Sequence, residues 1–286
     1  MTVFDPFFDQ QVELSEVTLH VVTAGDPEHP SIILLHGFPE FWYGWKEVAE
    51  LLVTAGYHVV IPDQRGYNTS DKPFWIGNYR IDRLADDIAE LIDWINKDRV
   101  YLAGHDWGAA VAWTVMTRHP DRIEQGVIVN VPHTRTFKQY LRQQPSQLRK
   151  SWYMFFFQLP LIPQLMLRLF GFRFLRRSLQ STSLPNTFTE SDIEQYLQAW
   201  RHSGISGMIN WYRAAFRRRD PTEYQPIDLP VRIIWGKQDR FLSAEMAELS
   251  LQWCQNGEVI FIEEATHWVL HEFSEKVAKL MIEFFH

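Results

Sequence analysis

Leu102-Ala103-Gly104-His105-Asp106-Trp107-Gly108-Ala109-Ala110 joins an apolar run to a helical pattern. The residues from Val100 to Ala103 predict a buried strand, and those from Ala109 to Arg118 predict a helix. Glycines two residues before and two residues after Asp106 allow the cramped turn that lifts a side chain above a sheet. The stretch therefore fits the strand-turn-helix pattern G-x-S-x-G, with aspartate in place of serine.

Asp106 has two interpretations. Aspartate is a common N-cap residue, so by itself it predicts only that a helix begins there. The glycines on both sides and the strand before them favour a nucleophilic carboxylate instead. Because the helix dipole favours a negative charge at the N-terminus, we predict an exposed, charged nucleophile at this position.

Similar short apolar runs recur along the chain, bounded by Gly, Pro, Asp or Asn, and they predict buried parallel strands. They cover residues 32–35, 58–61, 100–103, 127–129, 231–235 and 258–262, and the alternating residues 17–23 predict an edge strand. Helical patterns lie at 45–55, 81–96, 109–118, 243–254 and from 274 onward. This alternation predicts an α/β fold in which helices flank a mostly parallel sheet with right-handed crossovers.

A helical, aromatic segment rich in Arg and Gln interrupts the alternation and contains no strand pattern. We therefore predict an α/β core whose N-terminal part is 1–132 and whose C-terminal part is 225–286, with a helical cap domain at 133–224 inserted between them. The natural place for this cap, or lid, is over the C-terminal ends of the strands, where such sheets bind ligands.

Composition excludes several classes of protein. The chain has 286 residues, 46% of them hydrophobic and 22% charged, which is typical of a globular protein. Its formal net charge is −7 with scattered basic residues, so we expect no nucleic-acid partner. The single cysteine and the lack of a secretory signal pattern predict a cytoplasmic protein.

The most apolar stretch, Trp152 to Leu175, contains two prolines and several arginines. A helix that spans a membrane needs about twenty apolar residues without such interruptions. The stretch therefore predicts a broken helical segment that lines an apolar space, and we expect no stable membrane insertion. Whether the chain is a monomer or a homodimer cannot be decided from the sequence.

Asp239 and His267 each come just after a predicted strand, as Asp106 does. Parallel strands end at one edge of the sheet, so the three side chains are expected to meet there in the chain order nucleophile, acid, histidine. A carboxylate that orients an imidazole makes it a better proton acceptor for a hydrolytic water. We predict that Asp239 orients His267, which acts as the base.

Other polar residues near strand ends receive structural roles. His105 is expected to support the turn, and His271 is expected to be structural. The loop that holds Asp63 and Arg65 is expected to be locked by an ion pair between them. Asn130 occupies a further strand end but cannot carry the negative charge of an acid partner.

The motif His36-Gly37-Phe38-Pro39-Glu40 follows the strand at 32–35. Its glycine and proline can turn the chain so that a backbone N–H points into the site. Together with the N–H of Trp107, the N–H of Phe38 is predicted to form an oxyanion hole, where each donor commonly contributes about 3 to 4 kcal/mol.

With these motifs the chain resembles the epoxide hydrolases of the α/β-hydrolase fold, of the soluble type. The likeness extends over nearly the whole sequence and includes Ser151-Trp152-Tyr153 and Asn210-Trp211-Tyr212-Arg213 in the cap. It implies that Tyr153 and Tyr212 bind the epoxide oxygen, since a phenol with a pKa of about 10 can donate to a developing alkoxide. It implies no cofactor and no metal.

The expected substrate is a small apolar epoxide, which reacts with water. The residues expected to contact it, besides the tyrosines, are His36, Pro39, Trp107, Phe155, Phe156 and Trp268, with Leu161 and Met166 completing an apolar wall of the cap. Two alternatives stay open from the sequence. One is a haloalkane or haloacetate dehalogenase of the same fold, and the other is a ligand-binding protein that keeps the fold but does little chemistry.

Overall fold

The computed structural model describes residues 7–217 and 226–285. An eight-stranded sheet forms the centre, in the order β1-β2-β4-β3-β5-β6-β7-β8. Only the pairings of β1 with β2 and of β2 with β4 are antiparallel. The strands are β1 (Phe8–Glu13), β2 (Thr18–Ala24), β3 (Ser31–Leu35), β4 (His58–Pro62), β5 (Val100–His105), β6 (Ile123–Val129), β7 (Val231–Gly236) and β8 (Gly257–Ile262).

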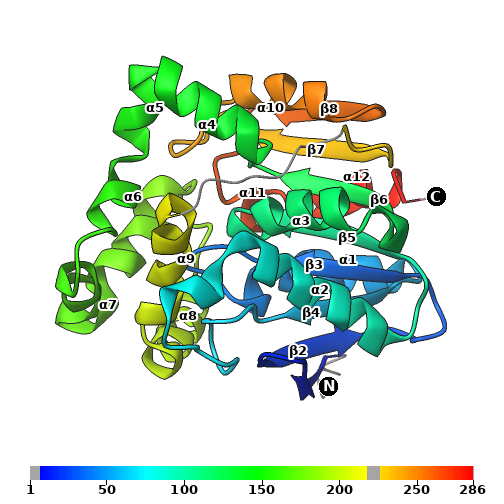
Figure 1. The fold of residues 1–286 in the computed structure, drawn as a ribbon, viewed down its shortest axis with the longest axis horizontal. Coiled ribbons are helices and arrows are strands. Elements are labelled where there is room, and N and C mark those ends of the chain that lie inside the picture. The colour runs from blue at the N-terminus through cyan, green and yellow to red at the C-terminus, as the bar shows by residue number, and fades with distance from the viewer. Residues whose placement is uncertain (1–6, 218–225, 286) are drawn as a thin grey trace.

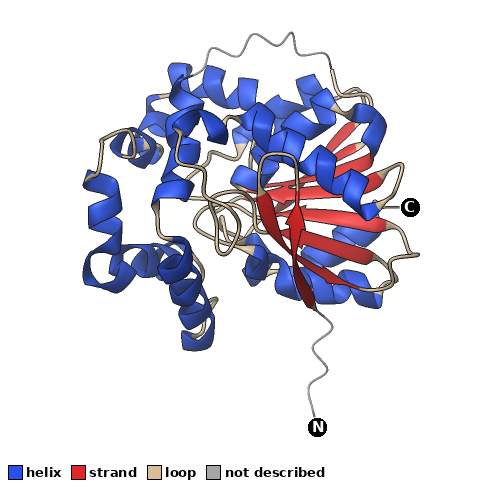
Figure 2. Ribbon diagram, turned by 60° about the horizontal axis from the view of Figure 1, so that its bottom comes forward, coloured by secondary structure: helices blue, strands red, loops and turns tan. Residues whose placement is uncertain are grey.

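Helices cover both faces of this sheet, as Figures 1 and 2 show. One face packs on α2 (Ile81–Ile95), α3 (Trp107–Arg118) and α10 (Glu245–Ser250). The other packs on α1 (Lys46–Thr54), α11 (Val269–Glu272) and α12 (Ser274–Ile282). The strands β3 and β4 are buried on both faces, which explains their continuous apolar sequence. The predicted mostly parallel sheet with flanking helices is confirmed.

The segment between β6 and β7 forms six helices in its described part. They are α4 (Thr134–Gln143), α5 (Pro145–Lys150), α6 (Trp152–Phe156), α7 (Ile162–Thr182), α8 (Glu190–Ser203) and α9 (Ser206–Arg217). In Figure 2 they lie beyond one end of the strands. The predicted boundary between residues 132 and 133 falls in the loop before α4, whereas the boundary between 224 and 225 lies outside the described residues.

The apolar stretch of the cap is broken, as its prolines predict. α6 ends before Leu159-Pro160, and Pro163 lies in the first turn of α7. A second break, which no proline predicts, interrupts α7 at Leu169–Phe172, where Phe170, Gly171 and Phe172 have φ values of 55°, 64° and 60°. In residues 7–217 and 226–285, none of the helices is long and apolar enough to cross a membrane.

Some predicted elements need correction. The strand β2 is not at the edge, because β1 pairs with its outer side. β1 escaped prediction since its sequence, Phe8 to Glu13, is mostly polar and exposed. The helix predicted at 243–254 is shorter, since α10 ends at Ser250 and a 3-10 turn follows.

Arg65 does not pair with Asp63 as expected. Its guanidinium binds Asp87 on α2 and Glu16, whereas Asp63 accepts from the imidazole Nδ1 of His20 at 2.7 Å. A buried arginine needs several acceptors, and the Asp63 carboxylate instead accepts from the Trp42 N–H and from Asn68 Nδ2, each at 2.7 Å.

Candidate active site

Asp106 occupies the turn between β5 and α3, with φ 50° and ψ −123°. Such a conformation is strained for a residue with a side chain, and tight packing maintains it. A Cβ on Gly104 would lie 2.4 Å from the carbonyl oxygen of Gly108, and one on Gly108 would lie 2.1 Å from that of Leu35. The turn therefore requires the two glycines that the sequence motif contains.

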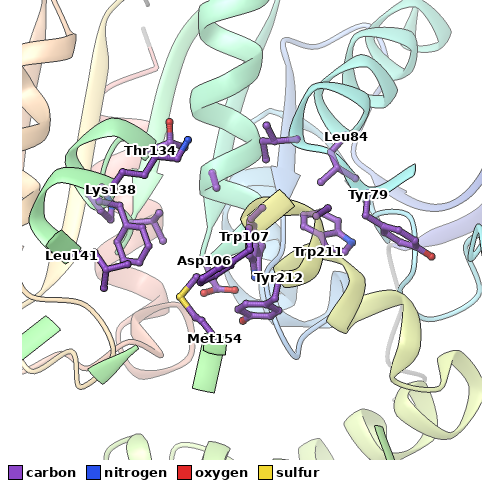
Figure 3. Close-up of a pocket in the computed structure, with 18 of the residues that line it drawn as sticks. Tyr79, Leu84, Asp106, Trp107, Thr134, Lys138, Leu141, Met154, Trp211 and Tyr212 are labelled. Atoms are coloured by element: carbon purple, nitrogen blue, oxygen red, sulfur yellow. The ribbon is translucent and has the colours of Figure 1, made fainter. Parts of the chain in front are cut away.

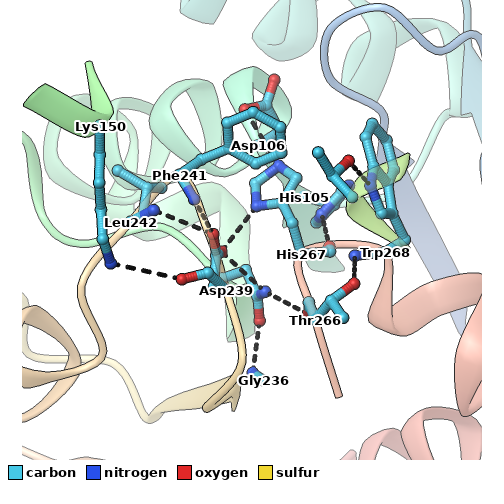
Figure 4. A network of polar contacts seen from close by, with 12 residues as sticks. His105, Asp106, Lys150, Gly236, Asp239, Phe241, Leu242, Thr266, His267 and Trp268 are labelled. Carbon is cyan, nitrogen blue, oxygen red and sulfur yellow. Dashed lines mark hydrogen bonds and ion pairs between the residues drawn. The ribbon is translucent and has the colours of Figure 1, made fainter. Parts of the chain in front are cut away.

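The sequence predicts an exposed carboxylate at Asp106, but in the structure this carboxylate is largely buried. Its side chain is 15% exposed, because Gly37 packs against it and the cap covers it. Oδ1 accepts a hydrogen bond from the backbone N–H of Phe38 at 2.6 Å. Oδ2 faces the imidazole Nε2 of His267 at 3.5 Å (Figure 4), and the two oxygens therefore have different neighbours.

His267 lies between two carboxylates. Its Nδ1 is 2.7 Å from Oδ2 of Asp239, while its Nε2 faces Asp106. Burial disfavours the charged imidazole, but the negative charges of Asp239 and Asp106 outweigh this and raise the pKa of His267 to about 10. Burial likewise opposes the charge on Asp106, and the hydrogen bond and charge of His267 lower the pKa of that carboxyl nonetheless. The resting site is an ion pair.

Asp239 has its acceptor capacity filled. Oδ1 accepts from the backbone N–H groups of Phe241 and Leu242 at 2.7 and 2.9 Å. Oδ2 accepts from Asn130 Nδ2 at 3.0 Å as well as facing His267. These contacts fix the carboxylate in the plane that orients the imidazole (Figure 4).

Tyr153 on α6 and Tyr212 on α9 reach the same site from the cap. Their ring centroids are 5.9 Å apart, and Tyr212 packs edge-on against Trp107 at 5.0 Å. Burial is the main cause that raises the pKa of both phenols above the ordinary value, and the charge of Asp106 adds to it. Both hydroxyls are therefore protonated at neutral pH and can donate.

A cavity of about 390 Å³ connects these groups. Among the described residues that line it, Asp106 is the only acidic one, and most of the others are apolar or aromatic. Figure 3 shows Thr134, Lys138 and Leu141 of α4 on one side of Asp106, and Tyr79 and Leu84 on the other. Such a space suits a small, largely apolar ligand that would extend to both sides of the carboxylate.

Comparisons with known proteins identify the family of the chain. Residues 30–274 match the family model described as alpha/beta hydrolase fold. The chain is 34% identical to Epoxide hydrolase 4 of Homo sapiens, over 96% of this chain and 77% of that protein. The chain belongs to the epoxide hydrolases of the α/β-hydrolase fold. It is also 44% identical to the AB hydrolase superfamily protein YfhM of Bacillus subtilis, over 96% of both chains.

Solved structures of this family superpose on the whole epoxide hydrolase chain. The crystal structure of the Bacillus megaterium epoxide hydrolase in complex with an inhibitor has a TM-score of 0.89 and 30% identity, covering 96% of this chain and 99% of that one. Epoxide Hydrolase A from Mycobacterium thermoresistibile has a TM-score of 0.89 and 28% identity, covering 98% of both chains. The likeness includes the cap as well as the sheet.

Two expected substrate contacts in the core of this epoxide hydrolase lie away from the cavity. The imidazole Nε2 of His36 accepts from the backbone N–H of Gln64 at 3.1 Å and is fully buried. Pro39 offers its carbonyl to the indole of Trp200 at 2.6 Å. These residues shape the loop that carries Phe38, and they do not line the cavity.

Three further expected contacts also point elsewhere. Phe155 is half exposed and packs on Phe216, Phe156 lies between neighbouring aromatic rings of α6, and Trp268 is buried with its indole donating to Thr182 at 2.8 Å. Leu161 and Met166 face outward too. In place of the expected wall, the cap lines the cavity with Met154, Trp211 and the two tyrosines, and α4 adds Phe137 and Leu141.

Two polar residues that sequence reasoning missed support the site. Asn130 donates to Asp239 and to the carbonyl of Thr266 at 3.0 Å, and its Oδ1 accepts from the N–H of Gly236 at 2.8 Å. It thereby ties the ends of β6 and β7 to the loop that holds the histidine. The position of Asn130 at the end of a predicted strand was the only feature of the sequence that indicated a role in the site.

Glu40 is a fully buried carboxylate behind the histidine. It accepts from the Tyr196 hydroxyl and faces His271 Nε2, each at 2.7 Å, and it lies 3.2 Å from His105 Nδ1. His105 Nε2 in turn lies 2.8 Å from the carbonyl oxygen of His267. Burial opposes the charge of Glu40, but His271 and His105 hold the pKa of Glu40 well below its ordinary value. Both histidines that were predicted to be structural contact this buried charge, and His105 connects it to the backbone of His267.

Proposed function

We propose that this chain converts an epoxide to a vicinal diol through a covalent ester on Asp106. In the first step Oδ2 of Asp106 attacks an epoxide carbon and the carbon–oxygen bond of the ring breaks. The released oxygen takes a proton from Tyr153 or Tyr212. Oδ1, which the Phe38 N–H already binds, becomes the carbonyl oxygen of the ester.

After the ester has formed, the imidazolium of the resting site gives its proton to the phenolate, so His267 becomes neutral. In the second step His267 takes a proton from water, and the resulting hydroxide attacks the carbonyl carbon of the ester. The N–H groups of Phe38 and Trp107 are proposed to hold the oxyanion that forms. Collapse of this intermediate releases the alkoxide of the diol, which takes the proton of the newly formed Asp106 carboxyl, and Asp106 keeps one oxygen that came from water. His267 keeps the proton that it took from water, so the ion pair of the resting site is restored.

The placement of Asp106 carries this proposal. One carboxylate faces a backbone donor at 2.6 Å, a histidine at 3.5 Å and a cavity shared with two protonated phenols. Paired phenols suit an oxygen leaving group. A halide site needs N–H donors, and the indole N–H of Trp211 already donates to the carbonyl of Arg65 at 2.9 Å, which disfavours the dehalogenase alternative.

The His267→Gln variant tests the mechanism directly. Incubated with a panel of epoxides and haloalkanes, it should accumulate an epoxide-derived ester on Asp106 that intact-mass measurement detects, because hydrolysis is blocked. The Asp106→Ala variant is the control and should form no adduct and no diol. An active Asp106→Ala enzyme would refute the proposal, and halide release without diol formation would place the dehalogenase first.

The origin of the diol oxygen gives a second readout. In a single turnover in water enriched in heavy oxygen, the label should enter the Asp106 side chain and not the diol. Label found directly in the diol would exclude an ester intermediate.

A further inference from the structure

The outer side of the cap exposes an unusual number of large apolar side chains. Among the described residues, eleven of the seventeen exposed large hydrophobic side chains lie between Leu148 and Phe174. Leu161, Leu165 and Phe170 are 77%, 61% and 83% exposed. Contiguous exposed apolar surface marks an interaction site, whereas scattered single residues do not. We call the exposed side chains of α6, α7 and the loop between them the apolar cap face.

The backbone at Phe170 adds to this observation. Its φ of 55° is unfavourable for a residue with a Cβ, and its ring gains little packing because it is mostly exposed. Residues in strained backbone conformations cluster at active sites, ligand clamps and switch regions. Figure 1 shows α5, α6 and α7 along the outer margin of the molecule, away from the sheet.

The chain around this face is strongly basic. Residues 125–189 contain no Asp or Glu, although the whole protein has a net charge of −7. Within this range there are nine basic residues, of which Arg176 pairs with Glu190 of α8 at 2.8 Å. The nine are Arg135, Lys138, Arg142, Arg149, Lys150, Arg168, Arg173, Arg176 and Arg177. An apolar face in a stretch whose own charged residues are all cations complements a surface with an apolar interior and a negatively charged exterior.

We propose that the apolar cap face docks on the surface of an anionic phospholipid membrane. Leu and Phe side chains would enter the boundary between headgroups and acyl chains, and the arginines would bind phosphates. A second copy of the chain is disfavoured as the occupant. In a two-fold symmetric contact the same face meets itself, and cations would meet cations without a carboxylate from residues 125–189.

The docking face adjoins the cavity. Phe155 packs on Phe216, with ring centroids 5.3 Å apart, and Phe216 lines the cavity together with Met154 of α6. An apolar compound dissolved in the bilayer would therefore have a short path to Asp106. The docking itself does not depend on the proposed ester, so the two can fail separately.

Cosedimentation of the full chain with vesicles tests this proposal. Vesicles of phosphatidylcholine mixed with phosphatidylglycerol should bind the protein, vesicles of phosphatidylcholine alone should bind it weakly, and added salt should release it. Arg168→Gln together with Arg173→Gln should weaken binding about 25-fold, since each cation near an anionic surface contributes about fivefold. Leu165→Ser together with Phe170→Ser should weaken it at least about tenfold.

The matched control is Phe74→Ser together with Trp75→Ser, because these side chains are 82% and 71% exposed but lie outside residues 125–189. This variant should bind vesicles as the parent does. Thermal unfolding should show that all variants fold. The proposal is overturned if the parent protein does not bind anionic vesicles, or if it binds vesicles with and without phosphatidylglycerol equally. A dimer without vesicles that the Leu165 and Phe170 changes dissociate would also overturn it, since the face would then be a self-association surface.

Discussion

Formation of the ester should change the charge of His267. In the resting site the imidazole Nε2 lies 3.5 Å from Oδ2 of Asp106 and its pKa is raised to about 10. At this distance and an effective dielectric constant of about 20, the attraction is about 5 kcal/mol, or about 3.5 pKa units. An ester is neutral and loses this attraction. The pKa of His267 in the intermediate should therefore fall to between about 6 and 7.

The direction of the pH dependence of ester hydrolysis follows from the role of His267 as the base, because an imidazole must be neutral to accept a proton. Hydrolysis of the ester should be slow below the pKa of the intermediate, rise through about pH 6 to 7 and stay constant above it. Ester formation needs a charged Asp106, whose pKa is lowered, so it should change little over this range. Rapid-quench single turnovers that count ester and diol separately would measure both rates.

A neutral variant provides the equilibrium control. In Asp106→Asn the amide replaces the carboxylate at nearly the same volume, so an NMR titration of His267 should show a pKa about 3.5 units below that of the parent. The reasoning is wrong if the two proteins titrate alike, or if ester hydrolysis keeps rising to pH 10. Either result would mean that Asp239 alone sets the charge of the imidazole.

Three further changes test other parts of the site. Tyr212→Phe keeps the ring contacts but removes the donor, so the rate of ester formation should fall at least about 100-fold while the melting temperature is unchanged; an unchanged rate would exclude its role. Asn130→Ala removes hydrogen bonds from Asp239 and two backbone groups, and denaturant titration should show a loss of about 1 to 3 kcal/mol in unfolding free energy. Gly108→Ala places a Cβ 2.1 Å from the carbonyl of Leu35, so it should cost at least about 1 to 3 kcal/mol in the same titration, and a neutral effect would contradict the packing described.

Most of the sheet could be predicted because the buried strands have a recognisable apolar sequence. A strand such as β3 is buried on both faces and is apolar throughout, which no loop of a globular protein tolerates. β1 could not be predicted in this way, because it is mostly polar and exposed and is held in the sheet by hydrogen bonds to β2. Backbone pairing alone imposes no hydrophobic pattern on the sequence of an exposed strand.

The position of the site was predictable for a related reason. Asp106, Asp239 and His267 each follow a strand, and the topology alone brings strand ends together. No comparable rule indicates which side chains of the cap line the cavity. α6 is apolar on every side, so its sequence gives no preference between Met154, which faces inward, and Phe155, which faces outward.

Glu40 shows a different limit. Its partners Tyr196 and His271 are 156 and 231 residues away, and only the folded chain places them around one carboxylate. A glutamate in a loop after a strand is normally a solvated residue, so its sequence context indicated nothing of this kind.

The hydroxyl of Tyr196 that reaches Glu40 also fastens one side of the cap to the core. Lifting α8 would remove a donor from a buried negative charge and cost about 1 to 3 kcal/mol before any other contact is lost. We expect α8 to act as a fixed anchor during turnover. Substrate and diol should then enter and leave where α4 and α9 border the cavity.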